Sequence, residues 1–213
     1  MGDMQVSSEY VAYGLHLISQ LSGGLQTAVL SHSQGGPVTQ WALRFWPSTQ
    51  KVTRAFVALS PDFSGIELAD SKLSDICVGD LCQASIWQQS SGSNYYDAMH
   101  ADEFGESVPT TAIWSSSDGI VNPPEHNAQL PGAVVNSVQD LCPGRIVSHI
   151  FMTIDAAAYA FAIDALNNGG SASLSRVRSN SWTSCLKLNA PNTNVSVAKS
   201  LSSSFNDLIG GFM

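Results

Sequence analysis

The stretch Ser31-His32-Ser33-Gln34-Gly35-Gly36 is a tight turn between two regular elements, and it decides the fold. The apolar run before it predicts a buried strand over 27–31, and the residues after it predict a helix over 36–46. A strand, a sharp turn with a central serine and then a helix form the layout of a nucleophile elbow. The helix that starts there aims free N–H groups and the positive end of its dipole at Ser33. The turn indicates a serine nucleophile. An ordinary strand–turn–helix is the alternative, because Ser31 replaces the usual first glycine.

The composition is that of a folded protein with few charges. The chain has 213 residues, of which 44 % are hydrophobic and 12 % are charged. This is enough apolar material for a core and too little charge for a disordered chain, and the length fits one domain over 1–213. The net charge is −8 without a basic patch, which excludes nucleic acid as an expected partner. The sequence shows no transmembrane stretch, and its polar start lacks the apolar core of a signal peptide.

Strands alternate with helices along most of the chain. The predicted strands are apolar throughout rather than alternating, which favours a parallel sheet covered on both faces. Residues 62–107 are predicted to be mostly loop and short helix, and residues 171–194 to be irregular. The other predicted strands are 55–59, 110–115 and 133–138, and the other predicted helices are 6–22, 152–166 and 195–209.

The four cysteines predict two disulfides. Three pairings are open, and the short loop between Cys77 and Cys82 favours a bridge there, which leaves Cys142 with Cys185. Four free thiols are the alternative. Disulfides indicate an oxidising compartment, and the sequon at Asn194 agrees with secretion. The cysteines and histidines lack zinc-type spacing, so no metal site is predicted.

Three polar residues follow predicted strands in the order of an α/β-hydrolase triad. Ser33 follows the strand over 27–31, Asp118 the strand over 110–115, and His149 the last predicted strand. The carboxyl ends of such strands are where this type of fold places its chemistry. A histidine is needed to take the serine proton, and a carboxylate to orient that histidine and stabilise its charged form. The order predicts a Ser-His-Asp site.

Other residues compete for the acid and base roles. Asp62 also follows a predicted strand, and Asp118 before a glycine is also typical of a plain turn. His16 lies in a predicted helix, and His32 is expected to point away from the base position beside Ser33. The remaining rivals of His149 are in predicted loops and expected to be solvated; they are His100 and His126.

Several separated motifs also agree in order and spacing with one family of known proteins. These are Ser33-Gln34-Gly35-Gly36, Gln40-Trp41, Ser60-Pro61-Asp62, Ser85-Ile86-Trp87-Gln88-Gln89, Val108-Pro109-Thr110-Thr111, Ser117-Asp118-Gly119-Ile120-Val121 and His149. By these motifs, nearly the whole chain resembles Candida antarctica lipase B and its fungal relatives. The resemblance implies a secreted α/β-hydrolase that cleaves and forms carboxylic esters, takes an ester or lipid as substrate and needs no cofactor.

The resemblance also implies roles for individual residues. It identifies Ser33 as nucleophile, Asp118 as acid and His149 as base, and it gives Gln34 an oxyanion-binding N–H. Polar residues near the family's pocket correspond to Asp62 and Gln89, which lowers Asp62 as a triad candidate. His32 stands where the family has a tryptophan that shapes the alcohol side of the pocket. A family disulfide matches Cys142–Cys185, and a pair in some fungal members matches Cys77–Cys82.

The sequence departs from the family at its start. Relative to the family it begins late, without the strands that precede the helix over 6–22. We therefore expect a truncated α/β-hydrolase fold, with a mostly parallel sheet of about four strands and helices on both faces. The strand over 27–31 becomes an apolar sheet edge, which predicts a homo-oligomer or an N-terminal segment that covers it.

The same departure bears on catalysis. No residue here matches the family's threonine that donates the other oxyanion hydrogen bonds. Loss of one donor lowers the rate roughly a hundred- to a thousandfold. We therefore expect a lipase or esterase of reduced activity that works through an acyl-enzyme, because all three triad positions are filled. The alternative is a catalytically impaired lipase-like protein with a binding or other non-enzymatic role.

Overall fold

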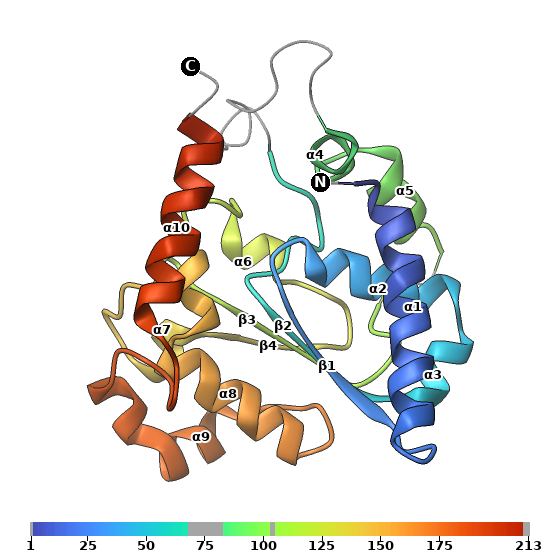
Figure 1. Ribbon diagram of the computed structural model, residues 1–213. Coiled ribbons are helices and arrows are strands. Elements are labelled where there is room, and N and C mark those ends of the chain that lie inside the picture. The colour runs from blue at the N-terminus through green and yellow to red at the C-terminus, as the bar shows by residue number, and fades with distance from the viewer. Residues whose placement is uncertain (1, 68–82, 103–104, 211–213) are drawn as a thin grey trace.

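A four-stranded parallel sheet forms the centre of the fold, and its strand order follows the chain (Figure 1). The computed structural model describes residues 2–67, 83–102 and 105–210. Because every pair is parallel, the carboxyl ends of neighbouring strands lie at the same edge of the sheet. The strands are β1 (Thr27–His32), β2 (Thr53–Leu59), β3 (Thr110–Trp114) and β4 (Val134–Ser137).

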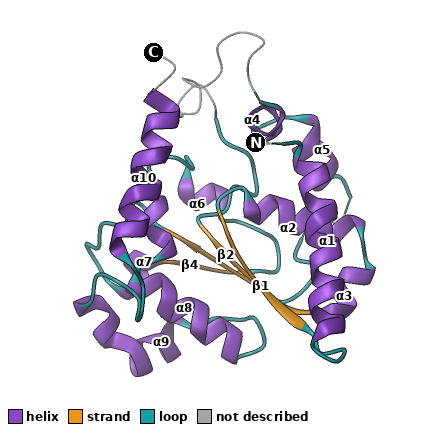
Figure 2. Ribbon diagram, viewed as in Figure 1, coloured by secondary structure: helices purple, strands orange, loops and turns teal. Residues whose placement is uncertain are grey.

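Helices cover both faces of this sheet, as the apolar strands predict (Figure 2). In β2, Val57 and Leu59 belong to a buried cluster that includes Phe161 of the helix α8. The alternate residues Phe56 and Ala58 belong to a second cluster on the other face, which contains side chains of α1 and α2. The helices are α1 (Met4–Leu21), α2 (Gly35–Phe45), α3 (Ser48–Val52), α4 (Ala84–Gln88), α5 (Asn94–His100), α6 (Pro124–Asn127), α7 (Val138–Leu141), α8 (Ala156–Asn167), α9 (Leu174–Ser181) and α10 (Val195–Gly210), with 3-10 turns η4 (Ile150–Thr153) and η5 (Trp182–Leu186).

Two expectations about the second half of the chain are wrong in detail. The helix predicted over 152–166 is two elements, because Asp155 caps a new helix by accepting the N–H groups of Ala157 and Ala158. The segment 171–194, predicted to be irregular, contains α9 and η5. Ser173 caps α9 by accepting the N–H of Arg176. Among the described residues, no helix is both long and apolar enough to cross a membrane.

Smaller differences concern the ends of the predicted strands and loops. The strand predicted over 55–59 begins two residues earlier, at Thr53, directly after the short helix α3 over 48–52. Pro124 begins the short helix α6, since a proline fits the first turn of a helix. The assignment of 1–213 to one domain stays a prediction.

The elbow strand β1 lies at one edge of the sheet, as expected. It pairs with β2 from Thr27 to His32, and β2 is its only strand partner in the described residues. Helix α1 packs against α2, and the side chain of Leu30 on β1 is 57 % exposed. The sheet therefore ends on a partly apolar strand.

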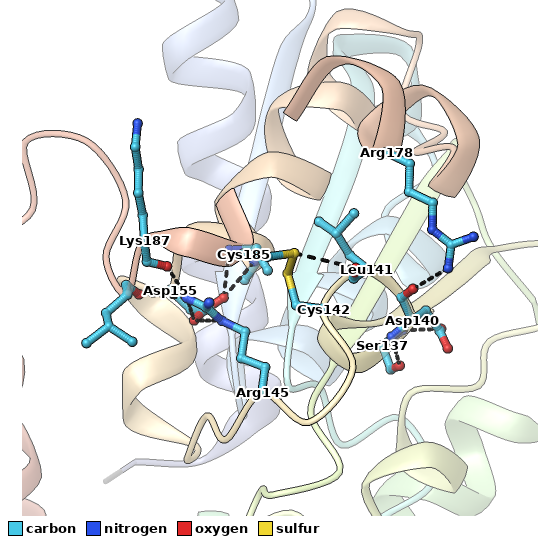
Figure 3. Close-up of a disulfide and its surroundings, with 12 residues drawn as sticks. Ser137, Asp140, Leu141, Cys142, Arg145, Asp155, Arg178, Cys185 and Lys187 are labelled. Carbon is cyan, nitrogen blue, oxygen red and sulfur yellow. Dashed lines mark hydrogen bonds and ion pairs between the residues drawn. A yellow bond between two sulfur atoms is a disulfide. The ribbon is translucent and has the colours of Figure 1, made fainter. Parts of the chain in front are cut away.

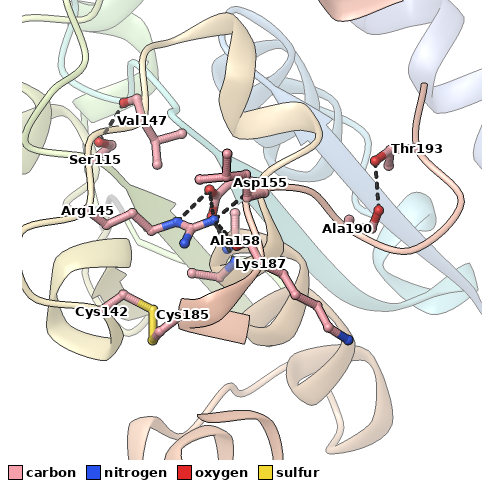
Figure 4. Close-up of polar contacts among 12 residues, drawn as sticks. Ser115, Cys142, Arg145, Val147, Asp155, Ala158, Cys185, Lys187, Ala190 and Thr193 are labelled. Carbon is pink, nitrogen blue, oxygen red and sulfur yellow. Dashed lines mark hydrogen bonds and ion pairs between the residues drawn. A yellow bond between two sulfur atoms is a disulfide. The ribbon is translucent and has the colours of Figure 1, made fainter. Parts of the chain in front are cut away.

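A disulfide and a buried ion pair tie the loop after α7 to the later part of the chain. Cys142 is bonded to Cys185, with 5.3 Å between the Cα atoms (Figure 3). Arg145 donates from Nε to Asp155 Oδ2 over 2.7 Å and from a second nitrogen to the carbonyl oxygens of Lys187 and Leu188 (Figure 4). The predicted bridge Cys142–Cys185 is confirmed.

Its predicted companion, Cys77–Cys82, lies outside the described residues. The confirmed bridge and the Arg145 ion pair together fix the segment that leads to His149.

The pair Arg145–Asp155 makes a prediction about stability. Its side chains are 7 % and 4 % exposed, so Asp155→Ala leaves a buried guanidinium without its carboxylate and removes the cap of α8. We expect this change to lower the free energy of unfolding by about 3–5 kcal/mol in urea titrations.

The matched control is Arg176→Ala, which breaks an ion pair to Asp164 whose arginine side chain is 42 % exposed. This variant is expected to lose about 1 kcal/mol or less. Equal losses in the two variants would contradict the structural role of the buried pair.

Candidate active site

Ser33 lies on a strained turn directly after β1. Its φ angle is +57°, which is uncommon for a residue with a side chain, and its N–H donates to Leu59 O over 2.9 Å. A Cβ on Gly36 would lie 2.7 Å from Cβ of Pro61, and one on Gly35 would lie 3.2 Å from Cβ of Ser31. Glycines at 35 and 36 therefore let α2 start close to the sheet. The small side chain of Ser31 leaves room for Gly35 beside it.

His149 and Asp118 form a buried hydrogen-bonded pair. His149 Nδ1 lies 2.7 Å from Asp118 Oδ2, and the residues are 3 % and 8 % exposed. The other carboxylate oxygen accepts the N–H groups of Ile120 and Val121 over 2.9 and 3.0 Å. Burial alone would raise the pKa of Asp118, but the hydrogen bond and charge of His149 and the two N–H groups lower it below its ordinary value. Asp118 therefore stays ionised, holds the proton on Nδ1 and leaves Nε2 of His149 as the basic nitrogen.

His32 contacts His149, so the expectation that it points away from the base is wrong. The ring centroids are 4.5 Å apart, and His32 Nε2 lies 2.9 Å from the backbone oxygen of His149. The loop after β4 returns across the carboxyl ends of the strands, and it brings His149 beside the residue that precedes Ser33. Burial, together with the nearby charge of His149, lowers the pKa of His32 to about 4.

Asp62 is completely buried after the end of β2, and no hydrogen bond joins it to His149 among the described residues. The Tyr96 hydroxyl lies 2.5 Å from Asp62 O and 3.1 Å from Oδ2, while Oδ1 has no partner among the described residues. Burial raises the pKa of Asp62 to about 7 despite the Tyr96 hydrogen bond, and the charge of Asp118 adds to the rise. The geometry therefore favours Asp118 over Asp62 as the partner of the base.

The backbone groups of Gln34 and Gln89 differ in their hydrogen bonds. Gln34 precedes α2, and in the described part of the chain its N–H has no backbone acceptor. This N–H is therefore free to bind an oxyanion beside Ser33. Gln89 is 5 % exposed at the end of α4, where its backbone oxygen accepts the N–H of Ile66.

The other histidines lie apart from the pair. His16 on α1 is exposed and lies 3.0 Å from Ser48 Oγ, and His126 on α6 is exposed. His100 is half-buried at the end of α5, with Nε2 2.7 Å from Phe63 O, so its expected solvation is wrong. Its surroundings were not visible in the sequence, because Phe63 is distant along the chain.

Two residues near the site were missed in the sequence. Ser60 has a φ of +44° and a buried hydroxyl without a partner among the described residues. The sequence Ser60-Pro61-Asp62 marks the end of a strand and could have indicated the sharp turn at Ser60. Tyr96 was missed because its contact to Asp62 joins residues far apart in the chain.

The fold is that of an α/β-hydrolase, and Ser33, Asp118 and His149 follow the chain order expected for a site in that fold. The chain is 31 % identical to lipase B of Pseudozyma antarctica over 153 residues, which are 71 % of this chain and 44 % of that lipase. Its fold matches the crystal structure of Aspergillus fumigatus lipase B with a TM-score of 0.82 and 32 % identity, over 98 % of this chain and 51 % of that one. These matches confirm the resemblance to fungal lipases of the lipase B type.

The chain spans about half the length of these two lipases. A Bacillus licheniformis lipase in its mature form also shares the fold, with a TM-score of 0.50 and 20 % identity. That match covers 63 % of this chain and 64 % of the Bacillus lipase chain. No family model matches the sequence.

The carboxyl of Asp62 makes a prediction about pH dependence. Because its folded pKa of about 7 lies above the ordinary value, the folded chain keeps a proton that the unfolded chain releases above about pH 4. Stability therefore falls as pH rises from about 4 to 7. We expect Asp62→Asn to be more stable than the native chain by about 3–5 kcal/mol at pH 8, and about equal to it at pH 4.

Urea titrations of both proteins at pH 4, 6 and 8 measure this difference. Asp97→Asn on α5 is the control, since Asp97 is exposed on the helix that carries Tyr96. It should stay within about 1 kcal/mol of the native chain at each pH. If the difference in free energy of unfolding between Asp62→Asn and the native chain does not change with pH, the pKa of Asp62 is not raised by burial.

Proposed function

We propose that this protein is a carboxylic ester hydrolase with Ser33 as nucleophile, His149 as base and Asp118 as acid. The observation that carries the proposal is the 2.7 Å contact between His149 Nδ1 and Asp118 Oδ2, in a loop that also contacts the residue before Ser33. The resemblance to two lipases supports the same chemistry. The substrate class is a carboxylic ester or lipid.

The proposed reaction has two halves. His149 Nε2 takes the Ser33 hydroxyl proton while Oγ bonds to the ester carbonyl carbon, and the carbonyl π electrons move to its oxygen. The C–O bond to the alcohol then breaks, the alcohol takes the proton from His149, and an acyl-Ser33 remains. Water repeats the sequence with His149 as base, which releases the acid and restores Ser33. Asp118 stays ionised throughout and stabilises the imidazolium.

The developing oxyanion is proposed to bind at the start of α2. The N–H of Gln34 and the positive end of the helix dipole are directed there. With the N–H of Gln34 as the one oxyanion donor identified in the described residues, we propose slow hydrolysis, lower than a complete oxyanion hole gives by roughly a hundred- to a thousandfold. Asp62 and Gln89 are proposed to border the substrate pocket, and His32 its alcohol side.

The second candidate function is that of a lipase-like binding protein with impaired catalysis. The partial set of oxyanion donors favours it, since a filled triad alone gives little rate without stabilisation of the oxyanion. We also propose that the protein is secreted, which the disulfide Cys142–Cys185 supports. Both candidates keep the fold and differ in whether Ser33 reacts.

Replacement of Ser33 decides between them. We expect the native chain to hydrolyse a short-chain p-nitrophenyl ester, and Ser33→Ala to lose at least about a thousandfold of that rate. A fluorophosphonate should label the native chain and not the variant, which reports activation of Ser33 separately from turnover. Ser179→Ala on the outer helix α9 is the control, because Ser179 is exposed and bonds only to Ser175 O among the described hydrogen bonds. Equal rates for Ser33→Ala and the native chain refute the serine mechanism.

The exposed edge makes a prediction about assembly. We propose that β1 pairs with a second copy of this chain, because its outer backbone groups lack a strand partner within the described sheet and Leu30 is 57 % exposed. Light scattering after size-exclusion chromatography should give the mass of a dimer or larger assembly. Leu30→Lys should shift the mass toward a monomer, since edge lysines oppose pairing. A native chain that is monomeric at every concentration contradicts this proposal.

A further inference from the structure

A second histidine, His32, contacts the candidate base in addition to its carboxylate partner. His149 is fixed at Nδ1 by Asp118, and its backbone oxygen lies 2.9 Å from His32 Nε2. The two imidazole rings also touch, with centroids 4.5 Å apart and planes tilted by 46°. Three separate contacts therefore determine where this one ring lies.

The partner of His32 determines which of its nitrogens carries hydrogen. A carbonyl oxygen only accepts, so Nε2 of His32 must be the donor. Burial and the charge of His149 lower the pKa of His32 to about 4, so the ring is neutral at pH 7. Near neutral pH, His32 is therefore the Nε2–H tautomer with an unprotonated Nδ1.

We propose that His32 is a positioning residue for His149: its Nε2–H holds the main chain of residue 149, and its ring packs against the imidazole. This inference rests on the proposed function, in which His149 is the base. The carbonyl of residue 149 receives only one other described hydrogen bond, a longer one of 3.3 Å from the N–H of Met152. His32 thus supplies the shorter of two contacts that fix the start of η4.

The charges around His32 suit this role. Within the described residues, the titratable groups that act on it are His149 and Asp118. Both rings cannot be charged at little cost, because like charges in contact disfavour each other. A neutral His32 therefore places no positive charge beside His149 when His149 takes the proton from Ser33.

The first experiment is a histidine nitrogen NMR titration, which needs no catalytic activity. In the native chain we expect His32 to be the neutral Nε2–H tautomer at pH 7 and to titrate near pH 4. In His149→Phe, which keeps a ring but removes the charge, the His32 midpoint should move to higher pH. A cationic His32 at pH 7, an Nδ1–H tautomer, or an unmoved midpoint in His149→Phe overturns the inference. The tautomer in the native chain decides it even if the variant does not fold.

The second experiment compares two replacements of His32 in ester hydrolysis. His32→Phe keeps the ring packing but has no donor, whereas His32→Gln places an amide N–H near the position of Nε2. Loss of one hydrogen bond corresponds to about a fivefold change, so kcat should fall about five- to tenfold in His32→Phe with KM within about twofold. His32→Gln should recover most of kcat, because it acts through the same carbonyl.

The matched control for the His32 variants is the same substitution at an exposed histidine. His16→Phe changes an exposed histidine of α1 in the same way and should leave both constants unchanged. The inference fails if kcat of His32→Phe equals that of the native chain, or if His32→Gln falls as far as His32→Phe. If the native chain does not hydrolyse esters, the proposed function fails alone, and the NMR titration still decides the role of His32.

Discussion

Parallel pairing of the strands is the constraint on which the rest of the structure depends. It brings the ends of β1, β2 and β3 to one edge of the sheet, where Ser33, Asp62 and Asp118 each follow a strand. The elbow adds to this constraint, because its positive φ turns the chain sharply and lets α2 start close to the sheet. The candidate site is thus a consequence of strand direction together with one strained residue.

His149 reaches this edge by a different route. It comes from the loop beyond β4, and its position depends on contacts made after the sheet is complete. The disulfide Cys142–Cys185 and the ion pair Arg145–Asp155 fix the segment before it, and Asp118 and His32 fix the residue itself. Long-range bonds therefore position the proposed base, His149, whereas local backbone geometry positions Ser33.

The contrast between local geometry at Ser33 and long-range contacts at His149 explains which parts of the structure the sequence could predict. The strands and the positions of Ser33 and Asp118 follow from apolar runs and turn residues, which are local signals. The contact of His32 with His149 joins residues 117 positions apart, so no local pattern shows it. The break before α8 depends on Asp155, whose capping role is local but whose ion pair to Arg145 is not. The contact of Tyr96 with Asp62 was hidden for the same reason.

The edge position of β1 has a consequence for how the site comes apart. Strand β1, which leads to Ser33, has one neighbour in the described sheet, whereas the segment before His149 is held by a disulfide and a buried ion pair. Segments with few neighbours open at lower free energy than the molecule as a whole. The serine and the histidine therefore belong to parts of unequal local stability. We therefore expect amide hydrogens of β1 to exchange with solvent before those around His149, and Ser33 to separate from His149 while most of the fold remains intact.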